Sequence, residues 1–389
     1  MRISNAIVVG GGIGGLSVAT ALAQQGVAVT LLEQAEALRD VGAGLQVSPN
    51  GMVVLRALGL ESALRERAAV ACEAVVLRDR TDGAQVARLD LARLRPDARY
   101  LFLHRADLIA VLAAAAQRAN VSFELGKTVA AVRPGDLPSV QLADGTTRRA
   151  ELVVAADGVH STARAVLNGP ERAQFSGQVA WRAVVPNEVG HPAEAHVTMG
   201  PGRHVVSYPL RAGRWVNLVA VEERETWAAE SWSQEDDPAH LRAAFAGFGG
   251  QTGEVLQGVD KAHLWGLHLH PVAETWAQEG VALLGDAAHP SLPFLAQGAN
   301  LALEDGYVLA AAVAAGGRDW AARYQMARRA RAVRVIRAAA GNAWRYHLQD
   351  GPIRWLAHRG LGALSRFAPG RMVGAFDWLY GFDVTAHPP

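Results

Sequence analysis

The sequence predicts an α/β protein with a helix-flanked parallel sheet, an inserted antiparallel sheet and a helical C-terminal segment. Three observations predict this fold. A strand, a glycine turn, a helix and a second strand follow one another over residues 6–33, as in a βαβ unit. Apolar, β-branched strands recur much later, at residues 152–156 and 281–286. Between them, residues 174–270 show mostly alternating patterns, which are typical of an antiparallel sheet.

The order of these elements predicts two domains and a tail. Residues 1–72, 100–172 and 271–330 are expected to form a discontinuous first domain, residues 73–99 and 173–270 an inserted second domain, and residues 331–389 the C-terminal helical segment. We expect helices at residues 104–117, 238–248 and 298–315. A chain of 389 residues with 50% hydrophobic and 19% charged residues is long enough for two domains and has an ordinary globular composition.

Charge and cysteine content limit the partners. Lys plus Arg number 38 and Asp plus Glu 37, so no basic field attracts nucleic acid or an anionic membrane. The single cysteine, Cys72, excludes an intramolecular disulfide and a cysteine-rich metal site. The longest apolar runs, such as residues 307–315, fall short of the roughly 20 residues that span a bilayer. We therefore expect a cytoplasmic protein without a leader, which binds small molecules and neither membrane nor nucleic acid.

The glycine turn predicts a dinucleotide site. Gly10, Gly12 and Gly15 form a GxGxxG motif, with Gly14 in the same loop, directly after a strand and at the start of a helix. The first glycine permits a tight turn, the second lets the backbone approach a pyrophosphate, and the third allows the helix to pack on the strand. The N–H groups and dipole of the helix start then face the phosphates.

Glu33 narrows the choice of nucleotide. It ends the second strand, 18 residues after Gly15, where a carboxylate accepts hydrogen bonds from ribose hydroxyls. The same carboxylate repels a 2′-phosphate, so the tightly held nucleotide is not expected to be NADP. NAD and FAD share this motif, and at this point both stay open.

Two later segments resemble a known family. Residues 152–164 (LVVAADGVHSTAR) and 283–306 (LLGDAAHPSLPFLAQGANLALEDG) are similar to the DG and GD motifs of single-component, class A flavoprotein aromatic hydroxylases, such as those of salicylate, 3-hydroxybenzoate and 6-hydroxynicotinate. The resemblance implies a Rossmann-like FAD-binding domain of the GR2, p-hydroxybenzoate hydroxylase type. It also implies a monooxygenase of aromatic compound catabolism, in which NADH or NADPH reduces FAD, O2 forms a C4a-hydroperoxide, and a small aromatic substrate is hydroxylated. A second GxGxxG after a strand is missing, so NAD(P)H is expected to dock transiently.

The resemblance also assigns residues around the flavin. Asp286 is expected to bind the ribityl chain, and Pro293 to lie beside the isoalloxazine ring. The N–H groups of Gln297, Gly298 and Ala299 begin a helix that points at the flavin pyrimidine ring, where they stabilise negative charge. Asn300 follows in the same turn. A purely structural alternative, in which Asp286 only caps a helix and binds no cofactor, stays open.

Further residues are expected near the FAD phosphates. Asp157 and Gly158 are assigned to the pyrophosphate and the passing nicotinamide, Arg164 to charge compensation, and Arg105 to the phosphates by its forked guanidinium. Gln46, in the loop GAGLQVSPN, is expected near the cofactor or the substrate ring. Arg105 and Asp107 could instead only solubilise the start of a helix.

His204 and Tyr208 are the candidates for substrate chemistry. They are four residues apart in RHVVSYPL, so on a strand they share one face. The pair resembles the His and Tyr of 3-hydroxybenzoate and 6-hydroxynicotinate hydroxylases, which implies that His204 deprotonates the substrate hydroxyl. Its ordinary pKa of about 6.5 suits that role. Gln297, with Trp181 and Arg182, is a further candidate for orienting the ring, although Arg182 could instead brace two strands.

Other polar residues receive no catalytic role. His268, His270 and His289 lack the spacing of a metal site, and no metal is expected. The tail arginines recur around their helix and predict a solvated or subunit-facing surface, which leaves a homodimer open; they are Arg323, Arg328, Arg329, Arg331, Arg334 and Arg337. Residues 377–384 resemble the closing segment of salicylate-like hydroxylases. Two alternatives remain: a purine, quinone precursor or polyketide as the substrate, or a flavin-binding sensor without turnover.

Overall fold

The computed structural model describes residues 3–38, 43–225, 234–341 and 343–386. Its first sheet has six strands in the order β19-β20-β12-β1-β2-β8, and all neighbours are parallel except β19 and β20. The bounds are β1 Asn5–Val9, β2 Ala28–Leu32, β8 Ser122–Glu124, β12 Leu152–Ala155, β19 Ala277–Gln278 and β20 Val281–Leu283. With α1 (Ile13–Gln24), β1 and β2 form the predicted βαβ unit, and the predicted α/β fold class is confirmed.

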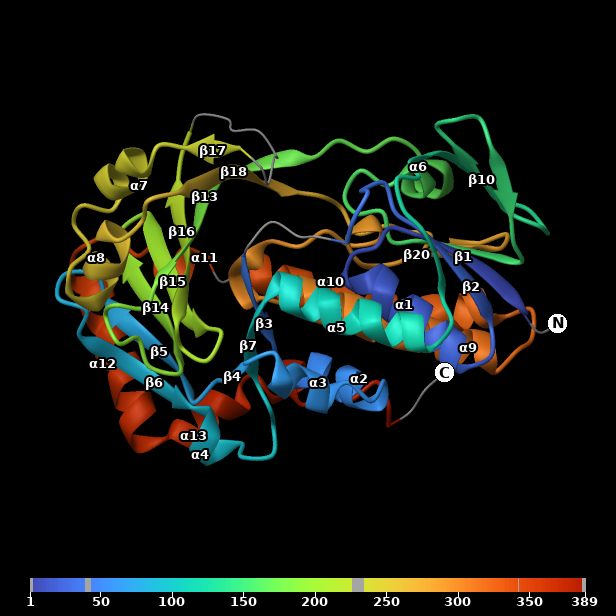
Figure 1. Ribbon diagram of the computed structural model, residues 1–389. Helices are drawn as coiled ribbons and strands as arrows, with labels where there is room; N and C mark the ends of the chain where they lie inside the picture. Colours follow the sequence, from blue (N-terminus) through green and yellow to red (C-terminus); the bar gives the residue numbers. More distant parts are fainter. Residues whose placement is uncertain (1–2, 39–42, 226–233, 342, 387–389) are drawn as a thin grey trace.

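Long helices pack beside this sheet (Figure 1). Helix α1 contacts both α5 (Arg105–Arg118) and α9 (Gly298–Ala314), and α9 contacts α10 (Trp320–Ala340). Glycines permit the close approach of α1 to α9, because a Cβ on Gly306 would lie 3.1 Å from the Val18 nitrogen. The start of α9 is thereby fixed relative to the glycine turn at the start of α1.

The second sheet has eight strands, in the order β17-β18-β13-β16-β15-β14-β5-β6. They are β5 Ala74–Asp79, β6 Gln85–Asp90, β13 Gln174–Pro186, β14 Glu194–Gly200, β15 Arg203–Leu210, β16 Trp215–Glu223, β17 Glu235–Asp236 and β18 Ala262–Leu269. The expected antiparallel pattern needs one correction, because β14 pairs with β5 in parallel. Strands β5 and β6 form a hairpin that comes much earlier in the chain than β14, so no tight turn imposes an antiparallel direction on the β14–β5 pair. The division of the chain into domains stays a prediction.

Two three-stranded sheets complete the strands. One is antiparallel with the order β11-β10-β9, formed by Val129–Arg133, Ser139–Leu142 and Thr147–Arg149 as β9, β10 and β11. Residues 129–149 thus form an antiparallel sheet of their own, and the chain returns to the first sheet at β12, the buried strand predicted at residues 152–156. The other sheet has the order β3-β7-β4, with bounds Gly44–Val47, Leu101–His104 and Val70–Ala71.

Shorter helices cover the remaining surfaces (Figure 1). Their bounds are α2 Pro49–Ala57, α3 Glu61–Glu66, α4 Leu91–Leu94, α6 Thr162–Asn168, α7 Pro238–Ala244, α8 Gly250–Gln257, α11 Ala343–Tyr346, α12 Pro352–Phe367, α13 Pro369–Gly374 and α14 Asp377–Tyr380, with 3-10 turns η1 Gly285–Ala287 and η2 Pro293–Leu295. The helix expected at residues 238–248 is α7, which ends at Ala244, and a separate helix, α8, follows from Gly250. Among the described residues, no helix is both long and apolar enough to cross a membrane.

Candidate active site

Four neighbouring parallel strands end at one edge of the first sheet. Glu33 follows β2, the glycine turn follows β1, Asp157 follows β12 and Asp286 follows β20. Ligands of open α/β sheets bind outside the carboxyl ends of the strands. The structure therefore brings together cofactor residues that the sequence separates by more than 250 positions.

The glycines at this edge differ in what surrounds them. A Cβ on Gly15 would lie 1.9 Å from the Gly10 carbonyl oxygen, and one on Gly10 would lie 2.4 Å from the Ala156 oxygen. Gly10 also has φ +102°, a conformation that favours glycine. Around Gly12, no described heavy atom lies within 4 Å of an added Cβ. Gly10 and Gly15 thus serve packing, whereas the Gly12 backbone is open to a ligand.

The carboxylates at the edge are held by backbone donors. Glu33 accepts hydrogen bonds from the nitrogens of Gly11 (2.5 Å) and Ala35 (2.9 Å), which aim its side chain at the glycine turn. Asp157 accepts one from the Thr162 nitrogen at 3.1 Å, and its other oxygen, Oδ1, is buried without a hydrogen-bond partner in the described part of the chain. Burial raises the pKa of Asp157. An unpartnered buried oxygen suits a ligand that donates a hydrogen bond.

Arg164 lies near the edge but contacts protein groups. Its guanidinium donates to the carbonyl oxygens of Ala287 and Ala288, both at 3.0 Å, and to the Pro271 oxygen and the Glu171 carboxylate. These contacts fix the turn that carries Asp286. Gly158 has φ +80°, as expected for the turn after β12. Arg105 begins α5 and is half-buried, and its neighbour Asp107 pairs with Arg211 at 3.1 Å instead of facing solvent alone.

Helix α9 begins at Gly298, with Gln297 before it, and no side chain caps this end. The preceding turn η2 starts with the exposed Pro293 and ends at Ala296, whose φ of +52° is unusual for alanine. The first N–H groups of a helix lack partners within it. The N–H groups of Gly298 and Ala299 therefore present partial positive charge at a turn whose backbone is held in a strained form.

Amide side chains lock this helix start to the loop after β3. Asn300 donates to the oxygens of Gln46 (3.1 Å) and Ala296 (2.7 Å) and accepts from the Ser48 nitrogen (3.0 Å). Gln297 is buried and donates to the Ser48 hydroxyl at 3.0 Å. Asn300 thus has a positioning contact that the sequence did not reveal, and its predicted cofactor role stays a prediction.

A fully buried charge cluster lies behind α9. Arg328 contacts Glu304 at 2.6 Å and Asp305 at 2.8 Å, Asp305 contacts His289 at 2.5 Å, and Arg331 contacts Glu304 at 2.7 Å. The predicted solvated surface is therefore wrong for Arg328 and Arg331, because they neutralise carboxylates inside the core. The sequence did contain a sign of this cluster. Glu304 and Asp305 are adjacent acidic residues in an otherwise apolar helix, and Arg328 and Arg331 are three positions apart and so lie on one face of the next helix.

His204 and Tyr208 do share one face of β15, and both are buried. The His204 ring lies 5.7 Å from Phe294, next to Pro293, and the Tyr208 ring lies 5.0 Å from Phe102 of β7. Burial, and to a lesser extent His347, holds the pKa of His204 well below its ordinary value. The expected pKa near 6.5 needs this correction, and the neutral imidazole is favoured at neutral pH.

Cross-strand register shows which neighbours join that face. Tyr208 on β15 is directly opposite Asn217 on β16, so the two side chains lie on one face of the sheet. Arg182 on β13 is opposite Val219, which is itself opposite Val206. Val206 is two residues from both His204 and Tyr208, so Arg182 lies on their face as well. Trp181 faces the other side, where it contacts Phe245 and donates to Asp236 at 2.7 Å. The expectation that Trp181 orients the substrate is therefore wrong, because adjacent strand residues point to opposite faces.

Asn217 is a site residue that the sequence reasoning missed. It is fully buried, its Oδ1 accepts from the Gly44 nitrogen at 2.7 Å, and its Nδ2 has no hydrogen-bond partner among the described residues. The sign of its role in the sequence was that Asn217 is the single amide side chain in the otherwise apolar strand WVNLVAV. Gln46, on β3, accepts from the Tyr100 hydroxyl at 2.5 Å, and the Tyr100 ring contacts Phe102, the neighbour of Tyr208.

Known proteins are similar to this chain over most of its length. The model of the FAD binding domain family matches residues 4–339. A 3-amino-4-hydroxybenzoate 2-monooxygenase of Streptomyces platensis is 36% identical over 388 residues, and a 3-hydroxybenzoate 6-hydroxylase of Polaromonas naphthalenivorans is 33% identical over 395 residues. Each alignment covers 97% of this chain and 96% of the relative. The chain belongs to the class A flavoprotein aromatic hydroxylases.

The solved structures agree with this assignment. The crystal structure of Klebsiella pneumoniae HpxO complexed with FAD and uric acid has a TM-score of 0.83 and 26% identity, and the match covers 95% of each chain. The predicted enzyme class and cofactor are therefore confirmed: this hydroxylase is an FAD-dependent monooxygenase, with NAD(P)H as the co-substrate typical of its family. The open space at Gly12, the unpartnered Asp157 oxygen and the uncapped start of α9 fit a dinucleotide flavin.

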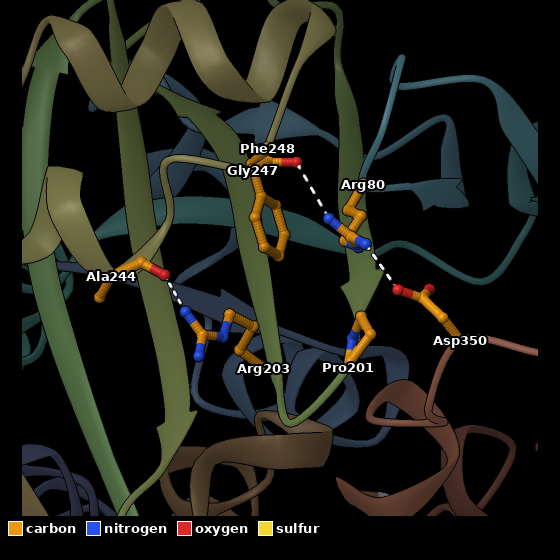
Figure 2. A pocket seen from close by; sticks show the side chains of 7 residues that line it. All are labelled: Arg80, Pro201, Arg203, Ala244, Gly247, Phe248 and Asp350. Atoms are coloured by element: carbon orange, nitrogen blue, oxygen red, sulfur yellow. Dashed lines mark hydrogen bonds and ion pairs between the residues drawn. The ribbon is translucent and has the colours of Figure 1, made fainter.

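Two surface cavities of this hydroxylase lie away from the predicted site. One, of about 270 Å³, is shown in Figure 2 and is lined by Arg80, Pro201, Arg203, Ala244, Gly247, Phe248 and Asp350. Arg203 precedes His204 on β15, so its side chain points to the opposite face. The other, of about 340 Å³, lies between α1, α2 and α9. Neither cavity is lined by a predicted site residue.

Proposed function

We propose that this FAD-dependent monooxygenase hydroxylates a small phenolic carboxylate, with O2 as oxidant and NADH or NADPH as reductant. The supporting observation is the placement of His204 and Tyr208 on one face of β15, with His204 beside the turn that leads to Gln297 and α9. Bound FAD would supply the electrons, taken from NADH or NADPH, that activate O2 so that one of its oxygen atoms is transferred to the substrate and the other is released as water. Relatives that cover nearly the whole chain are named for hydroxybenzoates, which favours that substrate class.

In this proposal, His204 takes the proton of the substrate hydroxyl. A phenolate is a stronger carbon nucleophile than a phenol, so proton removal speeds attack on an electrophilic oxygen. The neutral His204 imidazole is able to accept that proton at neutral pH. Tyr208, which contacts Phe102 of β7, and Gln46, which accepts a hydrogen bond from Tyr100, are assigned to orienting the substrate ring. The unpartnered Nδ2 of Asn217 is suited to donating a hydrogen bond to a substrate oxygen.

We assign the FAD contacts along the sheet edge. The Gly10–Gly15 turn is assigned to the pyrophosphate, Glu33 to the adenosine ribose, Asp157 and Gly158 to the pyrophosphate and the passing nicotinamide, and Asp286 to the ribityl chain. Pro293, Gln297, Gly298 and Ala299 are assigned to the flavin ring, and Arg105 to the phosphates. Arg164 is assigned to holding the Asp286 turn, because its donors already bind protein oxygens.

The substrate class is tested by product identification. The FAD-bound enzyme is given NADH or NADPH, air and one of 3-amino-4-hydroxybenzoate, 3-hydroxybenzoate or 6-hydroxynicotinate, and products are identified by mass spectrometry. We expect one of these to gain a single oxygen and to accelerate NAD(P)H oxidation. Uric acid, which is present in the HpxO structure, is the fourth arm. Hydroxylation of uric acid alone would replace the proposal with a purine substrate, and oxidation without any product would contradict both.

The place of the cofactor is tested at Gly12. Gly12→Ala puts a methyl group into space that is open in the protein, with φ −75° tolerated by alanine, so the unfolding temperature should not change. The same methyl group meets the FAD pyrophosphate, and FAD affinity should fall roughly tenfold or more, about 1.4 kcal/mol. Gly360→Ala on α12 is the matched control, since its Cβ also meets open space. Unchanged FAD affinity in Gly12→Ala would contradict the assignment.

We also propose a reducing, cytoplasmic setting and self-association. Cys72 is buried, and burial raises the pKa of its thiol to about 12, so it is poorly reactive. Helix α12 exposes Ile353, Leu356 and Phe367, which offers an apolar face to a second copy. Light scattering of the purified FAD-bound enzyme should give the mass of a homodimer; the mass of a monomer at micromolar concentration would contradict that part.

A further inference from the structure

His204 is the first member of a hydrogen-bonded chain that reaches the surface. Its Nδ1 lies 2.7 Å from Nε2 of His347, in the segment between α11 and α12. Nδ1 of His347 in turn lies 2.7 Å from Oε1 of Glu223, at the end of β16. Residues 204, 223 and 347 are far apart in sequence and meet only in the fold.

Exposure rises along this chain. His204 is 1% exposed and His347 is 4% exposed, whereas the Glu223 side chain is 48% exposed. Glu223 is therefore in contact with water, which His204 is not. The three groups form one hydrogen-bonded path from the proposed substrate face of β15 to solvent.

The path also sets the tautomers. An ionised Glu223 only accepts hydrogen bonds, so Nδ1 of His347 must carry a proton. Nε2 of His347 is then bare and accepts from Nδ1–H of His204. This leaves Nε2 of His204 as a bare acceptor, on the side of the ring away from the His347 contact. Glu223 thus prepares His204 to accept a proton on the nitrogen that is not engaged with His347.

We propose that His347 and Glu223 carry the substrate proton from His204 to solvent, an inference that rests on the proposed function. The substrate O–H gives its proton to Nε2 of His204, Nδ1–H of His204 passes its proton to Nε2 of His347, Nδ1–H of His347 passes its proton to Glu223, and Glu223 releases one proton to water. One proton enters and one leaves. The reverse sequence protonates the product phenolate and restores both tautomers.

The surroundings of the path make such an exit necessary. His204 also contacts the rings of Phe294 and Tyr346, neither of which stabilises an imidazolium as a carboxylate would. Burial lowers the pKa of His347, and the charge of Arg203, which itself pairs with Glu222 at 3.4 Å, lowers it further. A proton held on either histidine is therefore disfavoured, and Glu223 is the carboxylate that takes it over. His347 and Glu223 are positioning residues, since they act through His204.

A purely structural role is the competing account. The His347 carbonyl oxygen accepts from the Gly202 nitrogen at 3.2 Å, so this residue also ties the C-terminal segment to β15. That backbone contact survives replacement of the side chain. The two accounts are separated by the rate at which a bound phenol loses its proton.

The experiment follows proton release in the oxidised holoenzyme without NAD(P)H, so no turnover occurs. Rapid mixing with 3-amino-4-hydroxybenzoate is monitored through the phenolate absorption band and a pH-indicator dye. We expect His347→Gln to slow phenolate formation about tenfold or more and Glu223→Gln by a smaller factor, both with ligand affinity within about threefold. Added imidazole should restore the rate in His347→Ala. Glu225→Gln, which removes the same charge from an exposed site next to this strand end, is the control and should match the parent.

The possible outcomes test the role of His204 as the base separately from the proton path through His347 and Glu223. A parent enzyme that binds the phenol without ionising it overturns the proposed role of His204, and the path with it. A parent that ionises the phenol, together with a folded His347→Gln variant of equal rate and equal solvent isotope effect, overturns the path and leaves the proposed function intact. Slowing in both variants with loss of the solvent isotope effect supports the path.

Discussion

Two buried polar networks flank the predicted flavin position, and they differ in how they end. Behind α9, Arg328 and Arg331 neutralise Glu304 and Asp305, and these four side chains are at most 8% exposed. On the β15 side, His204 and His347 lead to the half-exposed Glu223. The arginines and carboxylates of the first network lie on α9 and α10, and His204 and Glu223 of the second lie on β15 and β16; Figure 1 shows where these helices and strands are. The first is closed and charge-compensated; the second opens to water.

The difference shows what each network is able to do. The closed network extends to the flavin end of α9, because Asn50 donates to Glu304 at 2.6 Å and to Gln297 at 3.0 Å. Charges paired in a low-dielectric core are costly to separate, so this network fixes Gln297 in place. The open network holds neutral imidazoles, each with one donor and one acceptor nitrogen, which is the arrangement that passes a proton along a hydrogen-bonded chain. One network maintains geometry, and the other is suited to proton transfer.

The largest expected effect comes from opening the closed network. Arg328→Met keeps the length of the side chain but leaves Asp305 without its cation in the core. Breaking a buried pair by removing one partner costs about 3–5 kcal/mol. We expect a loss of this size in the free energy of unfolding, measured by urea denaturation followed by circular dichroism. Arg331 still pairs with Glu304, and Asn50 still joins Glu304 to Gln297, so the hydroxylation rate per folded, FAD-bound molecule should change little.

Arg337→Met is the matched control on the same helix. Arg337 is exposed, and the change should alter stability by no more than about 0.5 kcal/mol. Equal unfolding curves for the two variants would show that the cluster is not a stabilising unit. The comparison between the networks would then fail.

The next effect concerns catalysis. His204→Gln keeps a polar side chain of similar volume but removes the base. Loss of a general base lowers rates by about 10²–10⁴-fold, so we expect kcat for hydroxylation to fall at least about 100-fold while FAD affinity is retained. Stopped-flow absorption with the preferred substrate measures this. A variant within threefold of the parent at neutral pH would assign the base elsewhere.

The smallest effect is on the pH dependence of stability. Burial, the larger cause, lowers the pKa of both His204 and His347 below their ordinary 6.5. Their stabilising contribution is therefore complete above about pH 6.5 and is lost as pH falls toward their folded-state values. Although burial alone would raise the pKa of Asp305, His289 and Arg328 hold it below 3.8, so the closed network loses stability only in stronger acid.

The measurement compares free energies of unfolding from pH 7 to pH 5. Each buried histidine contributes up to about 1.4 kcal/mol per pH unit, and His347→Gln should flatten the slope by up to that amount. The buried His191 and His196, whose pKa values are also lowered by burial, keep part of the slope in the variant. An unchanged slope would mean that His347 is not neutral in the folded protein.

The sequence was sufficient for what is local and repetitive. The GxGxxG turn, the buried strands around residues 153 and 282 and the motif that leads into α9 predicted the fold class and the edge where the cofactor residues meet. These signals depend on neighbours a few positions apart, where periodicity and turn chemistry act directly. The same-face placement of His204 and Tyr208 also followed from strand period alone.

The networks could not be predicted in this way, because their partners are far apart in the chain. Helical periodicity placed Arg328 around a helix but could not show that Asp305 packs against it. His347 was missed because it lies between two helices, 143 positions from His204. Trp181 was misplaced by one strand position, which is enough to put a side chain on the wrong face. Burial and pairing of charges are properties of the fold, and the pattern of one segment does not contain them.

The central claim is that the open network does chemistry and the closed network holds geometry. It is tested most directly by incorporation of ¹⁸O from ¹⁸O2 into the product, compared for parent, His204→Gln and Arg328→Met at equal concentrations of folded, FAD-bound enzyme. We predict that labelled product from His204→Gln falls at least about 100-fold, while Arg328→Met stays within about threefold of the parent. Equal labelling by His204→Gln and parent, or a loss in Arg328→Met as large as that in His204→Gln, would contradict it.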